Sequence, residues 1–189
     1  MSSVTERLSP RAHQIVAAAR ELLEDEGVDR LSMRSLGERL GMKAPSLYKH
    51  FASKQALEAT LISIGFEEQA ETFQAALDSS REPLAAMGAA YRAYAKRNPQ
   101  LYRLMYDRPL NRSLLVAGTE EAAAAPSFEA VGGDEELARA AWAFAHGMTI
   151  LELNDRFMAG TDLDAAWRHG IDALQAAVRK RRAHDGAGP

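Results

Sequence analysis

The chain has 189 residues with 26 acidic and 23 basic side chains, which give a formal net charge of −3. It contains no cysteine, which excludes disulfide bonds and thiol catalysis and fits a reducing compartment such as the cytoplasm. We see no apolar run typical of a signal peptide and no stretch apolar enough to span a membrane, so we expect a cytoplasmic protein.

The sequence predicts an all-α fold of about nine helices, because alanine is abundant and alternating strand patterns are nearly absent. Residues 1–8 are expected to form a flexible arm. The first helix begins at Ser9-Pro10, by the rule that a capping residue followed by proline starts a helix, and it ends at Gly27.

Residues 32–54 predict two short helices joined by a glycine turn, with a third helix following at once. Ser32 is a good N-cap, and Gly41 ends the first helix because glycine readily takes positive φ. Pro45 lies in the first turn of the second helix, where a missing amide hydrogen costs nothing. The apolar stripe of both helices consists of Met33, Leu36, Leu40, Leu47 and Phe51. This pattern is typical of a helix-turn-helix, whose second helix enters a DNA groove.

Basic residues concentrate in the same segment. Between Val28 and Lys54, six basic residues stand against two acidic ones on a chain that is acidic overall. The basic residues are Arg30, Arg34, Arg39, Lys43, Lys49 and Lys54, and the acidic ones are Asp29 and Glu38. A positive surface of this kind attracts DNA phosphates. A basic run alone is usually a solvated face, but the caps, the turn and the apolar stripe favour DNA binding.

The segment resembles the tetracycline-repressor-type (TetR) transcriptional regulators. The similarity lies in residues 36–42 (LGERLGM) and 47–51 (LYKHF), followed by Ser53-Lys54 and Leu57. Family-specific motifs cover roughly residues 9–64, and the remainder is similar only in helical pattern and length. Two positions depart from the family. Gly37 stands where alanine is common, which allows closer packing but weakens the helix, and Lys43 stands where a small capping residue is usual.

The resemblance implies roles for particular residues of this segment. Tyr48, His50 and Lys54 match positions that contact DNA phosphates, and Arg34 matches a position that can reach a base edge. The base-reading positions of the second helix correspond to Lys43, Ala44, Pro45, Ser46 and Lys49. Two interpretations of Lys43 stay open, namely contact with a base such as guanine and a plain solvated lysine.

Beyond the helix-turn-helix we expect a long connecting helix over 53–77 and then helices over 83–97, 100–106 and 111–125. A loop over 126–133 leads to a helix that Asp134 caps and that runs to Met158. Thr161 with Asp164 forms a capping-box-like start for the last helix, which ends near Arg182. The predicted domains are a DNA-binding domain over 9–58, an effector-binding and dimerisation domain over 59–182, and a flexible tail over 183–189.

The last two helices carry the predicted interface of a homodimer. One stripe consists of Trp167, Ile171, Leu174 and Val178, and a comparable one of Trp142, His146, Thr149 and Leu153. Two helices from each subunit would form a four-helix bundle. Residues 142–147 (WAFAHG) also resemble a C-terminal subgroup of the family that is marked by Trp and His-Gly. A symmetric dimer fits a palindromic DNA operator.

A set of aromatic and methionine residues is suited to an effector pocket for a small apolar or aromatic molecule. Its members are Met87, Tyr91, Tyr94, Tyr102, Met105, Tyr106, Phe128, Phe144 and Met148. The competing interpretation is that these side chains form plain core, which is the commoner use of such stripes. The existence of a pocket is implied by the family resemblance.

We predict no catalytic residue, no metal site and no cofactor. No metal-spaced cluster, phosphate-binding glycine loop or recognisable Ser-His-acid set is present. His146 lies six residues from Glu152, on a different face of one helix, so we interpret it as a packed interface histidine.

The predicted function is a homodimeric repressor that an effector releases from double-stranded operator DNA. The alternatives are a helical effector-binding or enzymatic protein with a vestigial DNA head, and a regulator controlled by a protein partner.

Overall fold

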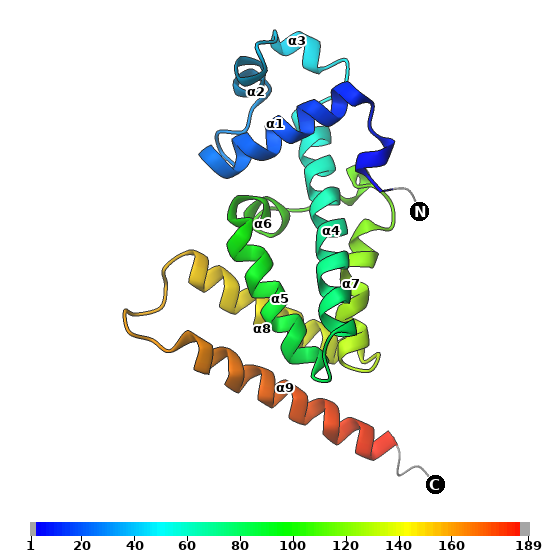
Figure 1. Ribbon diagram of the computed structural model, residues 1–189, viewed down its shortest axis with the longest axis vertical. Helices are drawn as coiled ribbons and strands as arrows, with labels where there is room; N and C mark the ends of the chain where they lie inside the picture. The colour runs from blue at the N-terminus through cyan, green and yellow to red at the C-terminus, as the bar shows by residue number, and fades with distance from the viewer. Residues whose placement is uncertain (1–2, 186–189) are drawn as a thin grey trace. The chain divides into compact units, whose positions relative to one another are not determined.

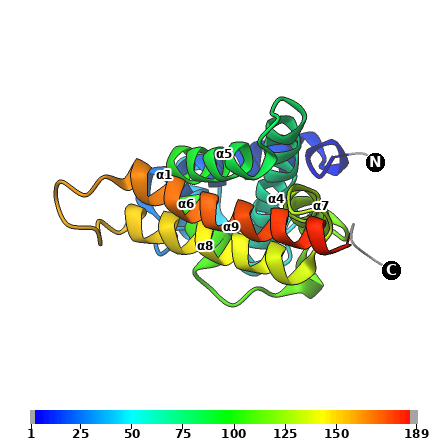
Figure 2. The ribbon, with the colours of Figure 1, turned by 90° about the horizontal axis from the view of Figure 1, so that it is seen from below.

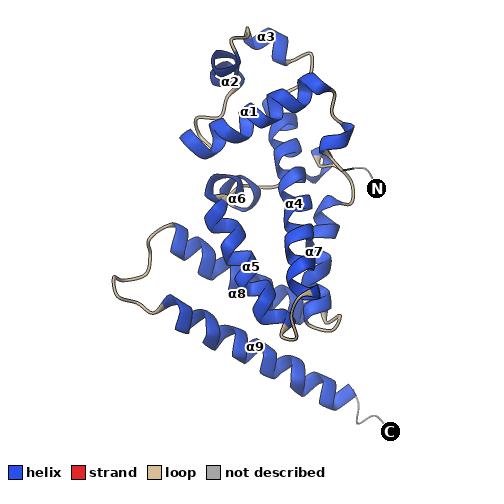
Figure 3. Ribbon diagram, in the orientation of Figure 1, coloured by secondary structure: helices blue, strands red, loops and turns tan. Residues whose placement is uncertain are grey.

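The computed structural model describes residues 3–185, and this part of the chain is all-α (Figures 1 and 3). It contains nine α-helices, two short 3-10 turns and, in the described residues, no strand. The predicted fold class is therefore confirmed. None of the helices in residues 3–185 combines the length and the hydropathy that crossing a membrane requires.

The chain forms two compact units, each with its own core. The head unit comprises Met1–Glu68 and Asn98–Ala122, and the body unit comprises Gln69–Arg97 and Ala123–Pro189. Compactness does not test which residues bind DNA or an effector, so the functional division between residues 58 and 59 stays a prediction.

The head unit is built around the helix-turn-helix. It contains α1 (Pro10–Glu26), α2 (Met33–Leu40), α3 (Ala44–Leu47), the first part of α4 (Lys54–Asp78), α6 (Pro99–Tyr106), the 3-10 turn Arg112–Leu114 and the start of α7 (Thr119–Ala130). Its fully buried side chains include Ile15, Leu22, Leu23, Leu36, Leu47, Leu57, Leu61 and Leu101. The predicted helices over 10–26, 33–40 and 53–77 are thus confirmed to within a residue or two.

A polar clasp joins α6 to α1 within the head unit. The Glu24 carboxylate of α1 accepts hydrogen bonds from the backbone amides of Gln100 and Leu101, at 3.1 and 2.9 Å. These amides lie in the first turn of α6, where a helix has no partner of its own for them. Arg20 adds hydrogen bonds to Glu68 on α4 and to Asn98 just before α6. The clasp therefore fixes α1 against both α4 and α6.

The predicted flexible arm is wrong for the residues that the structure describes. Thr5–Arg7 form a 3-10 turn, and the Val4 side chain is only 2% exposed. The Val4 amide donates to the Glu67 carboxylate of α4, at 2.8 and 3.0 Å. Sequence reasoning missed this attachment because its partner lies 63 residues away. Met1 and Ser2 lie outside the described residues.

In the body unit, α5 (Pro83–Arg97) packs against α8 (Glu135–Leu153) and α9 (Leu163–Asp185), and α8 and α9 run side by side (Figure 2). Two glycines allow this close packing. A Cβ added to Gly88 of α5 would lie 2.9 Å from Cδ1 of Ile171, and one added to Gly170 of α9 would lie 2.1 Å from Cζ of Phe144. Side chains larger than hydrogen would therefore force these helices apart.

A buried carboxylate ties α5, α8 and α9 together. The Glu152 side chain is 6% exposed and accepts a hydrogen bond from Nε1 of Trp167 at 2.5 Å and one from Nε of Arg92 at 2.9 Å. Arg92 also pairs with Asp164 at 2.5 Å and lies 5.8 Å from the ring centroid of Trp167. Because both partners hydrogen-bond the buried charge, its loss of hydration is offset.

The predicted helix over 111–125 and loop over 126–133 are wrong. Residues 112–114 form a 3-10 turn, Gly118 takes a φ of +85°, and α7 runs from Thr119 to Ala130. Pro126 lies inside α7, where it removes one backbone hydrogen bond, and its ring is buried. Burial of the α7 end, including Ala130, outweighs that loss.

The predicted boundaries around residue 158 are also corrected. α8 ends at Leu153, because Asp155 takes a φ of +49° and the Arg156 amide bonds back to the Leu151 carbonyl at 2.9 Å. The cap of α9 is Asp162, which accepts from the Ala165 amide at 2.9 Å, and Thr161 makes no such bond. α9 continues to Asp185, into the predicted tail, whose residues 186–189 lie outside the described part.

Candidate nucleic-acid interface

The caps and the turn of the helix-turn-helix form as the sequence predicts. The Ser32 hydroxyl accepts a hydrogen bond from the Ser35 amide at 3.0 Å, and the Ser35 hydroxyl accepts one from the Ser32 amide. Gly41 takes a φ of +64°, and the Met42 amide donates to the Gly37 carbonyl at 2.8 Å. This pair of features is a Schellman closure, which turns the chain sharply between α2 and α3.

Gly37 lets the turn lie directly on α2. A Cβ at this position would stand 2.8 Å from the Met42 carbonyl oxygen and 3.4 Å from the Ala44 amide nitrogen, and both atoms are backbone. The closer packing that the sequence suggests for Gly37 is therefore present. It places the start of α3 as near to α2 as the backbone allows.

The recognition helix α3 is short and anchored at its C-terminal end. The Leu47 side chain is fully buried and Phe51 is 6% exposed, while the amides of His50 and Phe51 both donate to the Leu47 carbonyl. Lys43 stands at the N-cap without any side-chain capping bond, as predicted from the missing small residue. Its side chain is therefore not committed to the helix and is exposed.

All the residues predicted to bind DNA lie in the head unit, on α2, α3, the turn after α3 and the start of α4. Arg34, Lys43, Pro45, Tyr48, Lys49 and His50 are exposed, whereas Ala44, Ser46 and Lys54 are half-buried. Tyr48 is the most unusual member because it is a large aromatic residue that is 50% exposed. Exposure makes these residues available to DNA, and their individual roles stay predictions.

Ion pairs divide the basic residues of this segment into two groups. Arg34 pairs with Glu38 at 3.0 Å, and Lys54 pairs with Glu58 at 3.1 Å. Lys43 and Lys49, which flank α3, form no ion pair with any residue that the structure describes. Two of the three basic residues of this segment that have no ion pair within the described chain, Lys43 and Lys49, therefore lie beside the recognition helix, and the third is Arg30.

Arg39 belongs to the paired group and supports the scaffold. Its guanidinium lies 2.5 Å from Asp25 and 3.7 Å from Glu21, both on α1. The hydrogen bond to Asp25 raises the pKa of Arg39 above its usual range. Its side chain is directed to α1 rather than to a DNA partner. The ion pairs of Arg34 and Lys54 could be predicted from the sequence, because each glutamate follows four residues later on the same helix. The Arg39–Asp25 pair could not, because it joins two different helices.

The predicted effector-binding residues are distributed over both units. Tyr102, Met105 and Tyr106 belong to the head unit, and the other six to the body unit. Met87, Tyr91, Tyr94, Tyr102 and Met105 are buried core residues. Phe144 packs on Gly170 and meets the Trp167 ring edge-on at 5.5 Å, so it serves the α8–α9 contact. A role for this set in effector binding stays a prediction.

Half of the residues predicted for the dimer interface are buried within the single chain. Thr149 on α8 and Trp167, Ile171 and Val178 on α9 are each less than 10% exposed. The α9 stripe is turned toward α5, where Ile171 and Trp167 lie beside Gly88. Burial of these four side chains leaves little surface for a partner subunit, and the dimer interface stays a prediction. Trp142, His146, Leu153 and Leu174 keep exposed or half-exposed surface, and Trp142 is 44% exposed. A stripe at helical spacing identifies a buried face without telling which neighbour buries it.

The remaining candidates for chemistry occupy structural positions. His146 stacks on Trp142 at a centroid distance of 5.9 Å, while Glu152 bonds Trp167 and Arg92, so the two lie on different faces as predicted. Within residues 3–185, no group of His, Asp and Glu side chains could hold a metal ion.

The sequence matches two models of one protein family. Residues 15–59 match a model described as bacterial regulatory proteins, tetR family, and residues 84–174 match a tetracyclin repressor-like C-terminal domain. The finer assignment to the subgroup marked by Trp and His-Gly stays a prediction. An uncharacterised HTH-type transcriptional regulator of Mycobacterium tuberculosis is 31% identical over 183 residues, which cover 91% of this chain and 83% of the relative.

Solved structures show the same fold. A crystal structure of a regulatory protein has a TM-score of 0.72 at 25% identity and covers 87% of this chain and 94% of its own. A variant of TetR from Acinetobacter baumannii, in complex with minocycline, has a TM-score of 0.64 at 24% identity and covers 93% and 99%. The sequence models, the full-length relative and the fold agree, and the chain belongs to the TetR family of transcriptional regulators.

Proposed function

We propose that this regulator is a repressor that binds a palindromic operator as a homodimer and leaves it when a small apolar molecule binds. The observation that carries the DNA-binding part is the division of charge around α3. Lys43 and Lys49 are exposed and have no acidic partner among the described residues, whereas the neighbouring Arg39 is neutralised by α1. Free positive charge beside an exposed recognition helix is what phosphate attraction requires.

The proposed contacts follow from side-chain chemistry. Arg34, Lys43 and Lys49 can donate to base edges, and Ala44, Pro45 and Ser46 make close contacts with the groove floor. Tyr48, His50 and Lys54 hold phosphates and set the register. Because Lys54 is 3.1 Å from Glu58, it must exchange that carboxylate for a phosphate or hold both.

The dimer is proposed to form through the outer surface of α8 and α9. Trp142 and Leu151 are 44% and 41% exposed, and His146 stacks on Trp142. A Cβ added to Gly147 would meet no atom of the same chain within 4 Å, so this surface is open to a partner. Trp142, a large apolar side chain left exposed on α8, supports an interaction site there.

The effector is proposed to bind a hollow of about 110 Å³ in the head unit. Its walls are mainly apolar and come from α4, the end of α6 and residues 109–115. The apolar lining residues are Ala59, Ile62, Leu104, Pro109, Leu110, Leu114 and Leu115. The hollow is somewhat smaller than the ~150 Å³ engineered cavity that binds benzene, so it suits an apolar group of a small molecule.

The same hollow is linked to the DNA-binding surface. Glu58 lines it and pairs with Lys54, one of the proposed phosphate contacts. An effector that moves Glu58 would change how far this carboxylate neutralises Lys54, and therefore how strongly Lys54 attracts a DNA phosphate. It can shift the equilibrium only if it binds the released form more tightly. The complex of the Acinetobacter protein with minocycline supports the binding of a small molecule by a chain of this fold.

The test is selection of bound sequences from a random duplex library at near-physiological salt, which suppresses non-specific phosphate binding. Recovery of a palindromic site is expected. Tyr48→Phe and Lys54→Ala should weaken binding to that site while the dimer, measured by sedimentation, stays intact. If no consensus is recovered, the chain is not a sequence-specific regulator, and an effector-binding or enzymatic role takes precedence. Loss of the dimer in either variant would contradict the division between head and body.

A further inference from the structure

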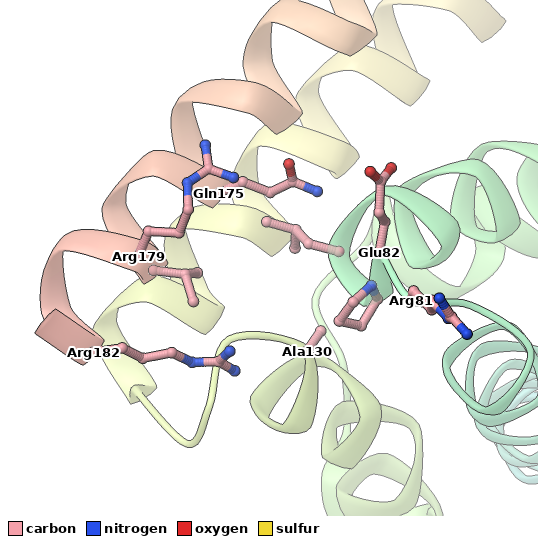
Figure 4. A pocket seen from close by; sticks show the side chains of 9 residues that line it. Arg81, Glu82, Ala130, Gln175, Arg179 and Arg182 are labelled. Carbon is pink, nitrogen blue, oxygen red and sulfur yellow. The ribbon is translucent and has the colours of Figure 1, made fainter. Parts of the chain in front are cut away.

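A hollow in the body unit is lined by three arginines that are not among the residues predicted to contact DNA. It has a volume of about 170 Å³ and lies between the start of α5, the end of α7 and the last turns of α9 (Figure 4). Arg179 and Arg182 stand on the α9 wall, and Arg81 and Glu82 stand on the opposite wall (Figure 4). The other lining residues are Pro83, Leu84, Ala130, Gln175 and Val178.

The α9 wall of this hollow combines a buried apolar stripe with exposed arginines. Trp167 and Ile171 are buried against α5, and Val178, which lines the hollow, is 8% exposed. In the last turns of α9 the positions i, i+4 and i+7 are Gln175, Arg179 and Arg182, which share one face. Arg179 and Arg182 are exposed and take no part in the α5–α9 core, so their guanidinium groups are available to a ligand.

The arginines of the hollow differ from the neighbouring Arg181 in their ion pairs. Arg181 forms an ion pair with Asp134, the N-cap of α8. By contrast, Arg81, Arg179 and Arg182 have no ion-pair or hydrogen-bond partner in the part of the chain that the structure describes. Glu82, the single acidic residue of the lining, also forms no ion pair with the residues that the structure describes. The lining keeps an excess of two positive charges, since three arginines face one glutamate.

Chemistry and size select the group that fits. Guanidinium groups bind phosphate and carboxylate oxygens through parallel hydrogen bonds, and phosphate offers the higher charge. The hollow is smaller than the ~300–1,000 Å³ of typical small-molecule pockets, so it holds a compact group rather than a whole drug-sized ligand. The first turn of α5, which begins at Pro83, adds the positive end of a helix dipole.

We propose that this hollow binds the phosphate or diphosphate group of a small molecule, with Arg179 and Arg182 as the main ligands and Arg81 closing the opposite side. Bound phosphate would link α9 to the start of α5 and thereby stabilise the body unit. The site would bind phosphate whether or not the chain binds operator DNA, so it is independent of the proposed repressor function.

The test uses inorganic pyrophosphate and the full chain, at constant ionic strength. Isothermal titration and the rise in Tm measure binding to the natural sequence. The variant Arg179→Gln/Arg182→Gln should lose at least tenfold in affinity and most of the rise in Tm. Lys180→Gln/Arg168→Gln is the matched control, because it removes the same charge from exposed positions of the same helix. It should stay within about twofold of the natural sequence.

Further measurements keep the proposal open to contradiction. Circular dichroism without pyrophosphate confirms that each variant folds, and Arg81→Gln, on the other wall, should independently weaken binding severalfold. Equal losses in the test pair and the control pair would show a general charge effect and overturn the proposal, as would no binding by the natural sequence. Binding of a random DNA duplex at low salt shows whether the phosphate belongs to a small molecule or to nucleic acid. If the natural sequence does not bind pyrophosphate and the test pair loses affinity for the duplex, the arginines bind nucleic acid and the small-molecule site is rejected.

Discussion

Charged side chains are used in opposite ways around α3 and around Glu152. Lys43 and Lys49 flank α3, a helix of only four residues, and both are exposed and have no acidic partner among the described residues. In the body unit, Glu152 is nearly buried and is held by Arg92 and Trp167. Buried, paired charge maintains the packing of three helices. Exposed, unpaired charge contributes little to stability and remains available to a partner.

The two regions should therefore respond differently to mutation. A substitution at Glu152 should change stability, and a substitution beside α3 should change DNA affinity while leaving stability almost unchanged. Surface charges generally contribute below about 1 kcal/mol to folding, whereas breaking one side of a buried pair costs several times more.

The largest expected effect is that of Glu152→Ala. Removal of the carboxylate leaves the Trp167 indole N–H without its acceptor and removes one of the two carboxylates that hold Arg92. We expect a loss of about 3 kcal/mol in the free energy of unfolding, measured by urea denaturation at fixed protein concentration. Glu135→Ala is the control, because the Glu135–Arg139 pair is exposed and should contribute less than about 0.5 kcal/mol. Similar losses in both variants would show that burial of Glu152 has no special effect.

Lys43→Ala and Lys49→Ala should have the next largest effects, on DNA binding alone. Each should reduce the slope of log affinity against log salt by about one if the lysine binds a phosphate. Arg39→Ala is the contrast, because Arg39 already pairs with Asp25 and Glu21. Lys43 has a second signature. If it reads a base, the loss should be larger by roughly 1–3 kcal/mol on one operator variant than on others. An equal loss on all sequences would rule out base reading.

Gly37→Ala should destabilise the head moderately. Alanine favours a helix by about 1 kcal/mol over glycine, but the new Cβ would stand 2.8 Å from the Met42 carbonyl oxygen. Forcing an extra methyl group into a packed site costs roughly 1–3 kcal/mol, so we expect a small net loss in Tm together with weaker operator binding. Gly147→Ala is the matched change, because its Cβ meets no atom of the same chain. It should raise the Tm, and a fall would indicate that a partner subunit packs there.

The fold and the candidate interface differ in how far the sequence predicts them. Ser32, Gly41 and Pro45 act on neighbouring backbone atoms, so the helix-turn-helix was predictable from local chemistry. Contacts across the chain were not. The bond from Val4 to Glu67 and the burial of Pro126 inside α7 depend on distant residues. The sequence also could not show which neighbour covers the apolar stripe of α9. Ile171 belongs to that stripe and lies against Gly88 of its own chain.

The smallest expected effect concerns pH and distinguishes a capping carboxylate from the exposed charges beside α3. Hydrogen bonding from the Leu137 amide, together with the nearby Arg181, holds the pKa of Asp134 below its usual range. The ionised form therefore stabilises the folded chain at pH values above the usual aspartate pKa of about 3.9. This contribution is lost as the pH falls through the lower pKa of the folded state. Asp134→Asn can still accept from Leu137, but it carries no charge.

The natural chain should consequently be more stable than Asp134→Asn at pH 7, and the difference should shrink below about pH 4. Urea denaturation between pH 3 and 7 measures it. Asp164→Asn should behave in the same way, because its hydrogen bond with Arg92 lowers the pKa of Asp164. Lys49 has no carboxylate partner among the described residues, so Lys49→Ala removes no ion pair. The stability of this variant relative to the natural chain should therefore not vary with pH over this range. A difference that persists unchanged to pH 3 would show that the two carboxylates act through shape rather than charge.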